Sequence, residues 1–171
     1  MKSDHYHLWM RLRLALVIAL AWLLGACGTS AVTPEQLTTA QQLLNGVNAA
    51  RAKGTTCGNT FYPAVSRLSL DLLLVQAAQA HSEDMLARGV LSHTGADGSN
   101  PGQRIARTGY KAATWGENAA AGYGSPDSVV NGWLNSPGHC RNIMNPAFTE
   151  LGGARAGNYW TLVLARPAPI R

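Results

Sequence analysis

The chain of 171 residues has few acidic side chains, few cysteines and no apolar segment long enough to span a bilayer. Aspartate and glutamate number nine against fourteen lysines and arginines, and cysteine occurs three times. The net charge is +5, but residues 1–26 account for +2 of it, and the other cations are scattered. Nucleic-acid-binding domains carry clustered basic side chains, so we expect no nucleic-acid partner.

Two motifs of hydrolytic enzymes are also missing. The chain contains neither the HExxH pattern of zinc peptidases nor the GxSxG pattern of a nucleophilic serine on a sharp turn. In "SPGHCRNIM" at 136–144, His139 and Cys140 are adjacent. Neighbouring side chains diverge by about 100° in a helix and point to opposite faces in a strand. A cysteine nucleophile that uses His139 as its base is therefore disfavoured.

The first residues resemble the export signal of a bacterial lipoprotein. Basic residues precede the apolar run "LALVIALAWLL" at 14–24, whose length suits a signal peptide and falls short of the ~20 residues that cross a membrane. "LGAC" then places small residues before Cys27, as at sites where a cysteine receives lipid. We expect a signal peptide at 1–26, lipidation of Cys27 and membrane attachment outside the cytoplasm. An ordinary secretory signal or an uncleaved anchor is the alternative.

Gly28 follows the expected lipidated residue. Lipoproteins that stay at the inner membrane often carry aspartate at this position. In a cell with two membranes, we therefore expect the anchor in the outer one.

The remaining cysteines form one candidate pair. With Cys27 lipidated, only Cys57 and Cys140 are left in an oxidising compartment, 83 positions apart. We expect a disulfide between them, worth roughly 4 kcal/mol in the chain-entropy account. Two free thiols are the alternative.

The rest of the chain predicts one domain. We expect a lipidated tether at 27–33, a domain at 34–167 and a short tail at 168–171. Helices are predicted from Pro34 to about Gly54, at about 69–88, at 101–108 and from Pro126 onward, with Thr33 and Ser125 as caps. "WGENAAAGYG" predicts irregular structure or a short strand, and "ELGGARA" and "YWTLVLAR" predict a hairpin around Gly157 and Asn158. Helices and a hairpin in irregular alternation favour an α+β fold.

Three polar residues fall where packing does not demand them. His93 and His139 lie in stretches rich in glycine, proline and serine, and Glu117 lies in "GEN". Two imidazoles and one carboxylate suit a zinc ion with a water in the fourth position, although their spacing alone does not indicate one. A brace of hydrogen bonds among three loops is the alternative. His81 lies on the apolar stripe of its helix and is expected in the core.

Several segments, in order, resemble the CAP superfamily of cysteine-rich secretory, antigen 5 and pathogenesis-related proteins. They are "VNAARAKG", "SHTGADGSNPGQRIARTGY", "WGENAAAG", "VVNGWLNSPGHCRNIM" and "FTELGGARAGNYWTLVLA". Together they cover roughly residues 40–166, and the form is similar to the compact bacterial branch. The resemblance implies a three-layer α-β-α sandwich with a mixed, mostly antiparallel sheet flanked by helices.

The resemblance also implies a shallow cleft where two histidines and two glutamates meet, which holds zinc or another divalent cation in some members. His93, Glu117 and His139 match three of these positions. Ser136 stands where the family has its second acid, so cation binding should be weaker here. Asn118 matches a structural neighbour whose amide holds the cleft loop, and Asn142 can do the same.

The function implied is that of a non-catalytic binding module. We expect a monomer, with a small lipid, a glycan or a protein surface as its ligand and no cofactor beyond a divalent cation in the cleft. A metal-dependent hydrolase using the same cleft is one alternative, and a structural envelope protein is another.

Overall fold

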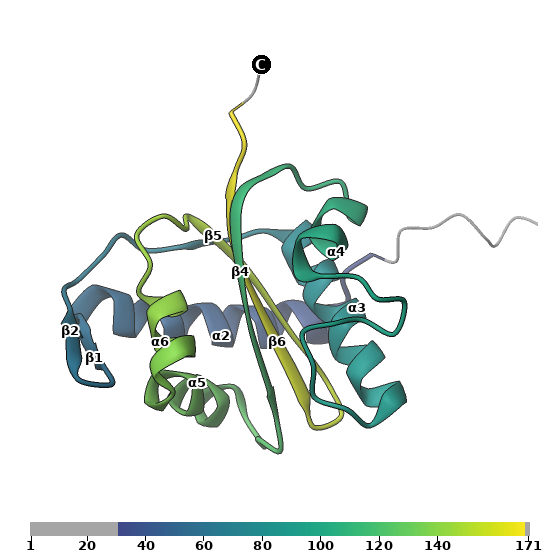
Figure 1. Cartoon of the computed structure of the whole chain (residues 1–171), viewed down its shortest axis with the longest axis horizontal. Helices are drawn as coiled ribbons and strands as arrows, with labels where there is room; N and C mark the ends of the chain where they lie inside the picture. The colour runs from purple at the N-terminus through teal and green to yellow at the C-terminus, as the bar shows by residue number, and fades with distance from the viewer. Residues whose placement is uncertain (1–30, 170–171) are drawn as a thin grey trace, which may run out of the picture. The chain divides into compact units, whose positions relative to one another are not determined.

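The computed structural model describes residues 31–169 (Figure 1). The predicted signal peptide and lipidation site at Cys27 lie outside this range. The elements in chain order are α2 (Pro34–Lys53), β1 (Thr55–Cys57), β2 (Thr60–Tyr62), β3 (Ser69–Leu70), α3 (Leu72–Arg88), α4 (Pro101–Arg107), β4 (Ala112–Ala121), α5 (Pro126–Asn135), α6 (Pro137–Ile143), β5 (Glu150–Ala156) and β6 (Tyr159–Pro167).

Strands β3, β4, β5 and β6 form one mixed sheet, in which their order is β3-β5-β6-β4. β3 pairs with β5 in parallel, whereas β6 pairs antiparallel with both β5 and β4. The hairpin predicted around Gly157 and Asn158 is present as β5 and β6, and β4 forms one edge of the sheet. The mixed, mostly antiparallel sheet expected from the sequence is thus confirmed.

Each face of the sheet carries its own apolar core. Trp160, Leu162 and Leu164 of β6 pack with residues of α2, α5 and α6. Val163 and Ala165, which alternate with them, pack with residues of α3 and α4. Because successive strand residues point to opposite faces, one strand supplies both cores and the result is the α-β-α sandwich. Figure 1 shows α3 and α4 on the other side of the sheet from α5 and α6.

Local signals place two of the helices where the sequence predicts them. Thr33 caps α2 and Ser125 caps α5, each with a proline in the first turn and a reciprocal capping box. α3 begins at Leu72 rather than near residue 69, because Asp71 caps it by accepting a hydrogen bond from the Leu74 amide. The two residues before that cap form β3 instead.

Three stretches differ from the sequence-based expectation. Residues 115–121 of "WGENAAAGYG" belong to β4, a strand of ten residues, and only the last three residues of the segment lie outside it. The segment around Cys57, for which no helix or strand is predicted above, forms the β1–β2 hairpin. His139 lies in α6 rather than in a loop. β4 pairs with β6, which is distant in sequence, and the disulfide ties α6 to β1, whereas β1 and β2 pair with each other locally.

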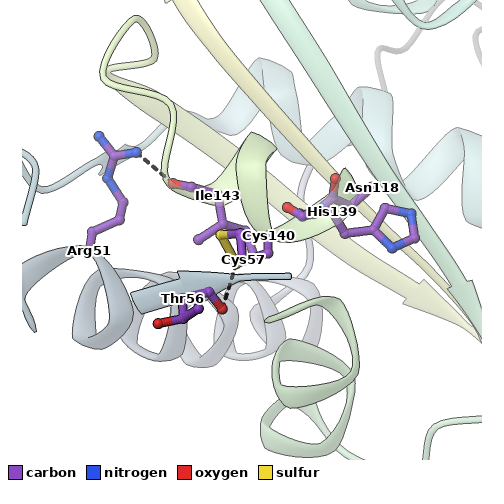
Figure 2. Close-up of a disulfide and its surroundings, with 7 residues drawn as sticks. All are labelled: Arg51, Thr56, Cys57, Asn118, His139, Cys140 and Ile143. Carbon is purple, nitrogen blue, oxygen red and sulfur yellow. Dashed lines mark hydrogen bonds between the residues drawn. A yellow bond between two sulfur atoms is a disulfide. The ribbon is translucent and has the colours of Figure 1, made fainter. Parts of the chain in front are cut away.

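Cys57 and Cys140 form the expected disulfide, which excludes the alternative of two free thiols (Figure 2). Their Cα atoms are 5.4 Å apart, within the usual range for a disulfide. Both cysteines are buried among the residues of the α2, α5 and α6 face. The bond therefore fixes α6 to the β1–β2 hairpin inside a packed core.

Arg51 is a fully buried cation near the end of α2. Its guanidinium donates to the carbonyl oxygens of Ser66, Ile143 and Asn145 at 2.6–3.0 Å and to that of Phe148 at 3.4 Å. Figure 2 shows the bond to Ile143, the last residue of α6. Burial lowers the pKa of Arg51, and the converging carbonyl dipoles offset the loss of hydration.

Among the helices of residues 31–169, none combines the length and the apolar character required to cross a membrane.

We predict that Arg51→Met lowers the free energy of unfolding by about 3 kcal/mol, because it leaves several buried carbonyl groups without donors. Arg67→Met is the matched control: Arg67 is exposed, and the change should be within about 0.5 kcal/mol. Urea unfolding followed by circular dichroism measures both. Equal stability of the two variants would contradict the role given to Arg51.

Candidate functional site

The candidate site lies at the edge strand β4, where two consecutive residues face opposite sides of the sheet. Glu117 pairs with Val163 and therefore faces α3 and α4, whereas Asn118 pairs with Leu162 and faces α6. Both residues are buried. The "GEN" segment thus sends a carboxylate into one layer and an amide into the other.

The Glu117 carboxylate is surrounded by three basic side chains. Its Oε1 atom lies 2.8 Å from His93 Nδ1 and 3.6 Å from His81 Nε2, and its Oε2 atom accepts a hydrogen bond of 2.7 Å from Arg104. The Glu117 side chain is only 2% exposed. A carboxylate this deep needs compensating donors, and the contacts with His93 and Arg104 supply one to each oxygen.

The loop that carries His93 is tied to α3 by several contacts. The His81 ring bonds the Ser92 carbonyl at 2.8 Å, which makes Nε2 its protonated nitrogen because a carbonyl only accepts. Arg88 donates to the Thr94 carbonyl at 2.9 Å, and the Ala96 amide donates to Asp84 at 3.2 Å. His81, buried as predicted, thus positions the neighbour of His93.

His139 approaches the site from the other layer. Asn118 donates to its backbone carbonyl at 3.1 Å, and Asn142 donates to Asn118 at 2.9 Å and to the Glu117 carbonyl at 3.3 Å. Figure 2 shows the His139 ring directed away from the neighbouring Cys140 and its disulfide. Asn118 and Asn142 therefore attach α6 to β4, and the geometry separates the imidazole of His139 from the sulfur of Cys140.

The structure brings the predicted residues together only in part. His93 and Glu117 are in direct contact, whereas no hydrogen bond or ion pair within residues 31–169 joins the His139 ring to Glu117. Ser136 lies between α5 and α6, where its side chain makes no capping hydrogen bond, and in the same range no hydrogen bond connects it with His93 or Glu117. The cluster also contains Arg104 and His81, which the sequence analysis did not place there.

Arg104 had no local signal. It lies in the short helix α4 next to the buried Ile105, and arginines beside apolar residues are usually exposed. The sequence points to this partner only indirectly, through Glu117. A glutamate inside a strand that is buried on both faces requires a strongly basic partner, but only the fold shows that α4 supplies it.

The pKa values of the three histidines are shifted in different directions. The hydrogen bond to Glu117 raises the pKa of His93 above its ordinary value. Burial lowers the pKa of His81, and burial together with the nearby His93 lowers the pKa of His139. As acidity increases, His93 should be the first of the three to take up a proton.

The arrangement does not fit the divalent cation predicted for this cleft. Both oxygens of Glu117 are engaged, one by His93 and one by the permanent charge of Arg104. Within residues 31–169, no group of three or more His, Cys, Asp or Glu side chains is placed to hold an ion. The set His93, Glu117 and His139 stays a prediction from the sequence, and the engaged carboxylate counts against it.

We predict that His93 titrates above the ordinary histidine value of about 6.5 and that His81 and His139 titrate below it. The His93 contact therefore stabilises the fold below about pH 6.5 and is lost as pH rises through the raised pKa. The lowered pKa values of His81 and His139 have the opposite effect on stability. Their contribution is present above about pH 6.5 and is lost as the pH falls below that value. Ring NMR titrations, assigned with single-histidine variants, measure this. In Glu117→Gln the His93 pKa should fall, and an unchanged value would refute the cause given.

Comparison with known proteins gives relatives that share this domain. The profile of the cysteine-rich secretory protein family, CAP, matches residues 44–163. The Bacillus subtilis (strain 168) protein YkwD, described as uncharacterized, is 36% identical over 96 residues, which are 55% of this chain and 37% of that protein.

Two solved structures are also similar. An extracellular SCP-domain protein from Bacillus anthracis matches with a TM-score of 0.68 and 27% identity, over 81% of this chain and 45% of that one. An outer surface protein from Borrelia burgdorferi matches with a TM-score of 0.65 and 23% identity, over 80% and 96%, and supports the fold alone. The chain spans less than half the length of YkwD and of the B. anthracis chain. The profile match, covering most of the chain, and the α-β-α sandwich together show that this protein belongs to the cysteine-rich secretory protein (CAP) family.

Proposed function

We propose that this chain is a lipid-anchored CAP domain outside the cytoplasm that acts as a non-catalytic binding module. The lipoprotein-like segment ending at Cys27 supports the anchor. The buried disulfide supports an oxidising compartment. The similar protein from B. anthracis is an extracellular one, which agrees with that location.

The contacts of Glu117 are the reason for proposing a non-catalytic module. A general base or a metal ligand needs a free oxygen within reach of the reacting group, and both oxygens of Glu117 are already bound by His93 and Arg104. Within residues 31–169, no serine, threonine or cysteine side chain bonds the ring of His93 or His139. The site therefore lacks the pairing of nucleophile and base that covalent hydrolysis requires.

The ligand we propose is a polar surface, either a glycan or a protein, rather than an acyl chain. The His93 side chain is 56% exposed, and most residues of the loop that follows it are exposed and small or polar. A recess of about 640 Å³ beside the start of α2 is lined mainly by hydroxyl, amide and charged side chains, including Thr33, Gln36 and Arg155. Acyl chains favour an apolar lining.

A hydrolase remains a second candidate because of one observation. Glu117 accepts a hydrogen bond from one nitrogen of the His93 ring at 2.8 Å, and a carboxylate in this position can orient an imidazole for general-base work. The ring is on the surface, so its second nitrogen could act on water. Arg104 takes the other oxygen of this carboxylate, and no nucleophilic side chain within residues 31–169 bonds the His93 ring, which makes this candidate the less favoured one.

We predict that Cys27→Ser moves the protein from the membrane to the soluble fraction outside the cytoplasm and abolishes labelling by radioactive palmitate. The lipid would supply the membrane affinity, and no helix within residues 31–169 is long and apolar enough to cross a membrane. Thr29→Ala is the control, and it should remain labelled and in the membrane. A wild-type chain that takes up no palmitate would refute the anchor.

We predict that the protein sediments with insoluble cell-wall glycan and that His93→Ala combined with His139→Ala weakens this binding about tenfold, the loss expected when about 1.4 kcal/mol of contacts is removed. Asn59→Ala with Thr60→Ala, which changes two exposed residues of the β1–β2 hairpin, is the matched control. Equal binding by both variants and the wild type would contradict a role for the cleft. Ester or peptide hydrolysis that Glu117→Gln abolishes would favour the hydrolase.

A further inference from the structure

The contacts of Glu117 define a closed ionic cluster. Its two oxygens face different partners, with His93 and His81 on the side of Oε1 and Arg104 on the side of Oε2. The Glu117 and Arg104 side chains are 2% and 8% exposed, respectively. A dissolved cation could therefore reach the carboxylate only by displacing a group that already occupies the space around it.

Arg104 is held in place by contacts other than the one with Glu117. Its guanidinium also donates to the Ser99 carbonyl at 2.8 Å. The helix that carries it starts at a capping box formed by Asn100 and Gln103. Arginine carries a permanent positive charge in proteins. These anchors keep a permanent positive charge beside Oε2.

Three side chains of the cluster are of the kinds that bind zinc, although they are not placed to hold an ion as they stand. Zinc binds imidazole nitrogen and carboxylate oxygen at about 2.0–2.2 Å, so two ligand atoms on one tetrahedral ion lie about 3.3 Å apart. His81 Nε2 and Glu117 Oε1 are 3.6 Å apart, and His93 Nδ1 lies 2.8 Å from the same oxygen. Either imidazole can release a proton and offer a free nitrogen to the ion, whereas an arginine side chain keeps its positive charge.

We infer that Arg104 is the resident cation of this cluster, which takes the place of a metal ion and makes the site refuse divalent cations. Arg104 occupies Oε2 of Glu117 in place of an ion, and Oε1 of the same carboxylate orients His93. Replacing Arg104 with a neutral side chain frees an oxygen of Glu117. His81, His93 and Glu117 are then the three side chains that a zinc ion could recruit, provided that the His81 ring gives up its bond to the Ser92 carbonyl. This inference holds whether or not the chain is anchored or binds a glycan.

The test is zinc titration of the full-length protein in a non-ionic detergent by calorimetry at pH 7.5, with thermal unfolding measured in parallel. Four chains are compared after metal removal: wild type, Arg104→Gln, Arg107→Gln, and Arg104→Gln combined with Glu117→Gln. Arg107 lies on the same helix, and its side chain is 58% exposed and pairs with Asp97. Arg107→Gln therefore makes the same change in charge outside the cluster.

We expect Arg104→Gln alone to bind one zinc ion, at least about tenfold more tightly than the wild type or Arg107→Gln, since changes in the groups around a ligand alter metal affinity by about 10–100-fold. The gain should disappear in the double variant, and zinc should raise the unfolding midpoint of Arg104→Gln only. If Arg104→Gln is unfolded without metal, zinc should restore its circular dichroism spectrum. The inference is overturned if zinc does neither, or if the wild type binds zinc through Glu117.

Discussion

The burial of one guanidinium is the constraint on which the rest of this domain depends. Arg51 projects from α2 to a place where four carbonyl oxygens from separate segments converge, and the last residue of α6 supplies one of them. A buried charge is tolerated only if its donors are satisfied. The end of α6 must therefore stay against α2, which places Cys140 opposite Cys57 and brings His139 to the edge of the sheet.

The edge strand β4 connects the two layers through adjacent residues. Glu117 serves the ionic cluster on the α3 and α4 side, and Asn118 serves the amide contacts to α6 on the other. Because side chains alternate along a strand, slipping the register by one residue would exchange the two. The carboxylate would then face the carbonyl of His139, and Arg104 would meet an amide. The register of β4 against β6 is thus fixed by electrostatics as well as by apolar packing.

The parts of the fold predicted from the sequence are those with local chemical causes. Thr33 followed by proline, Ser125 followed by proline, and the turn at Gly157 and Asn158 each specify a boundary without help from the rest of the chain. α6 begins with the same serine–proline pair, but Ser136 makes no capping hydrogen bond, and the glycine that follows Pro137 is more typical of a loop. Its seven residues are few for an independent helix, and this one is held by Arg51 and by the disulfide.

The candidate site also combines residues that the sequence indicates locally with residues that only the fold brings there. His93 and Glu117 were recognisable as polar residues in positions that packing does not explain, and the resemblance to CAP proteins paired them. The partner that dominates the electrostatics, Arg104, could not be found in this way, because the burial of an arginine is a property of the fold. His81 was expected in the core on helical spacing, but its bond to the loop of His93 depends on where that loop turns back.

The disulfide also decides what a single cut in the backbone can do. Cys57 and Cys140 close a covalent ring that contains the loop carrying His93, together with α3, α4, β4 and α5. A protease that cleaves one peptide bond inside this ring leaves both fragments joined through sulfur, so no piece is shed. Loops outside the cytoplasm are exposed to such nicking. In this domain, a chain cleaved once in the loop of His93 would keep its mass and both of its layers until a reductant opened the ring.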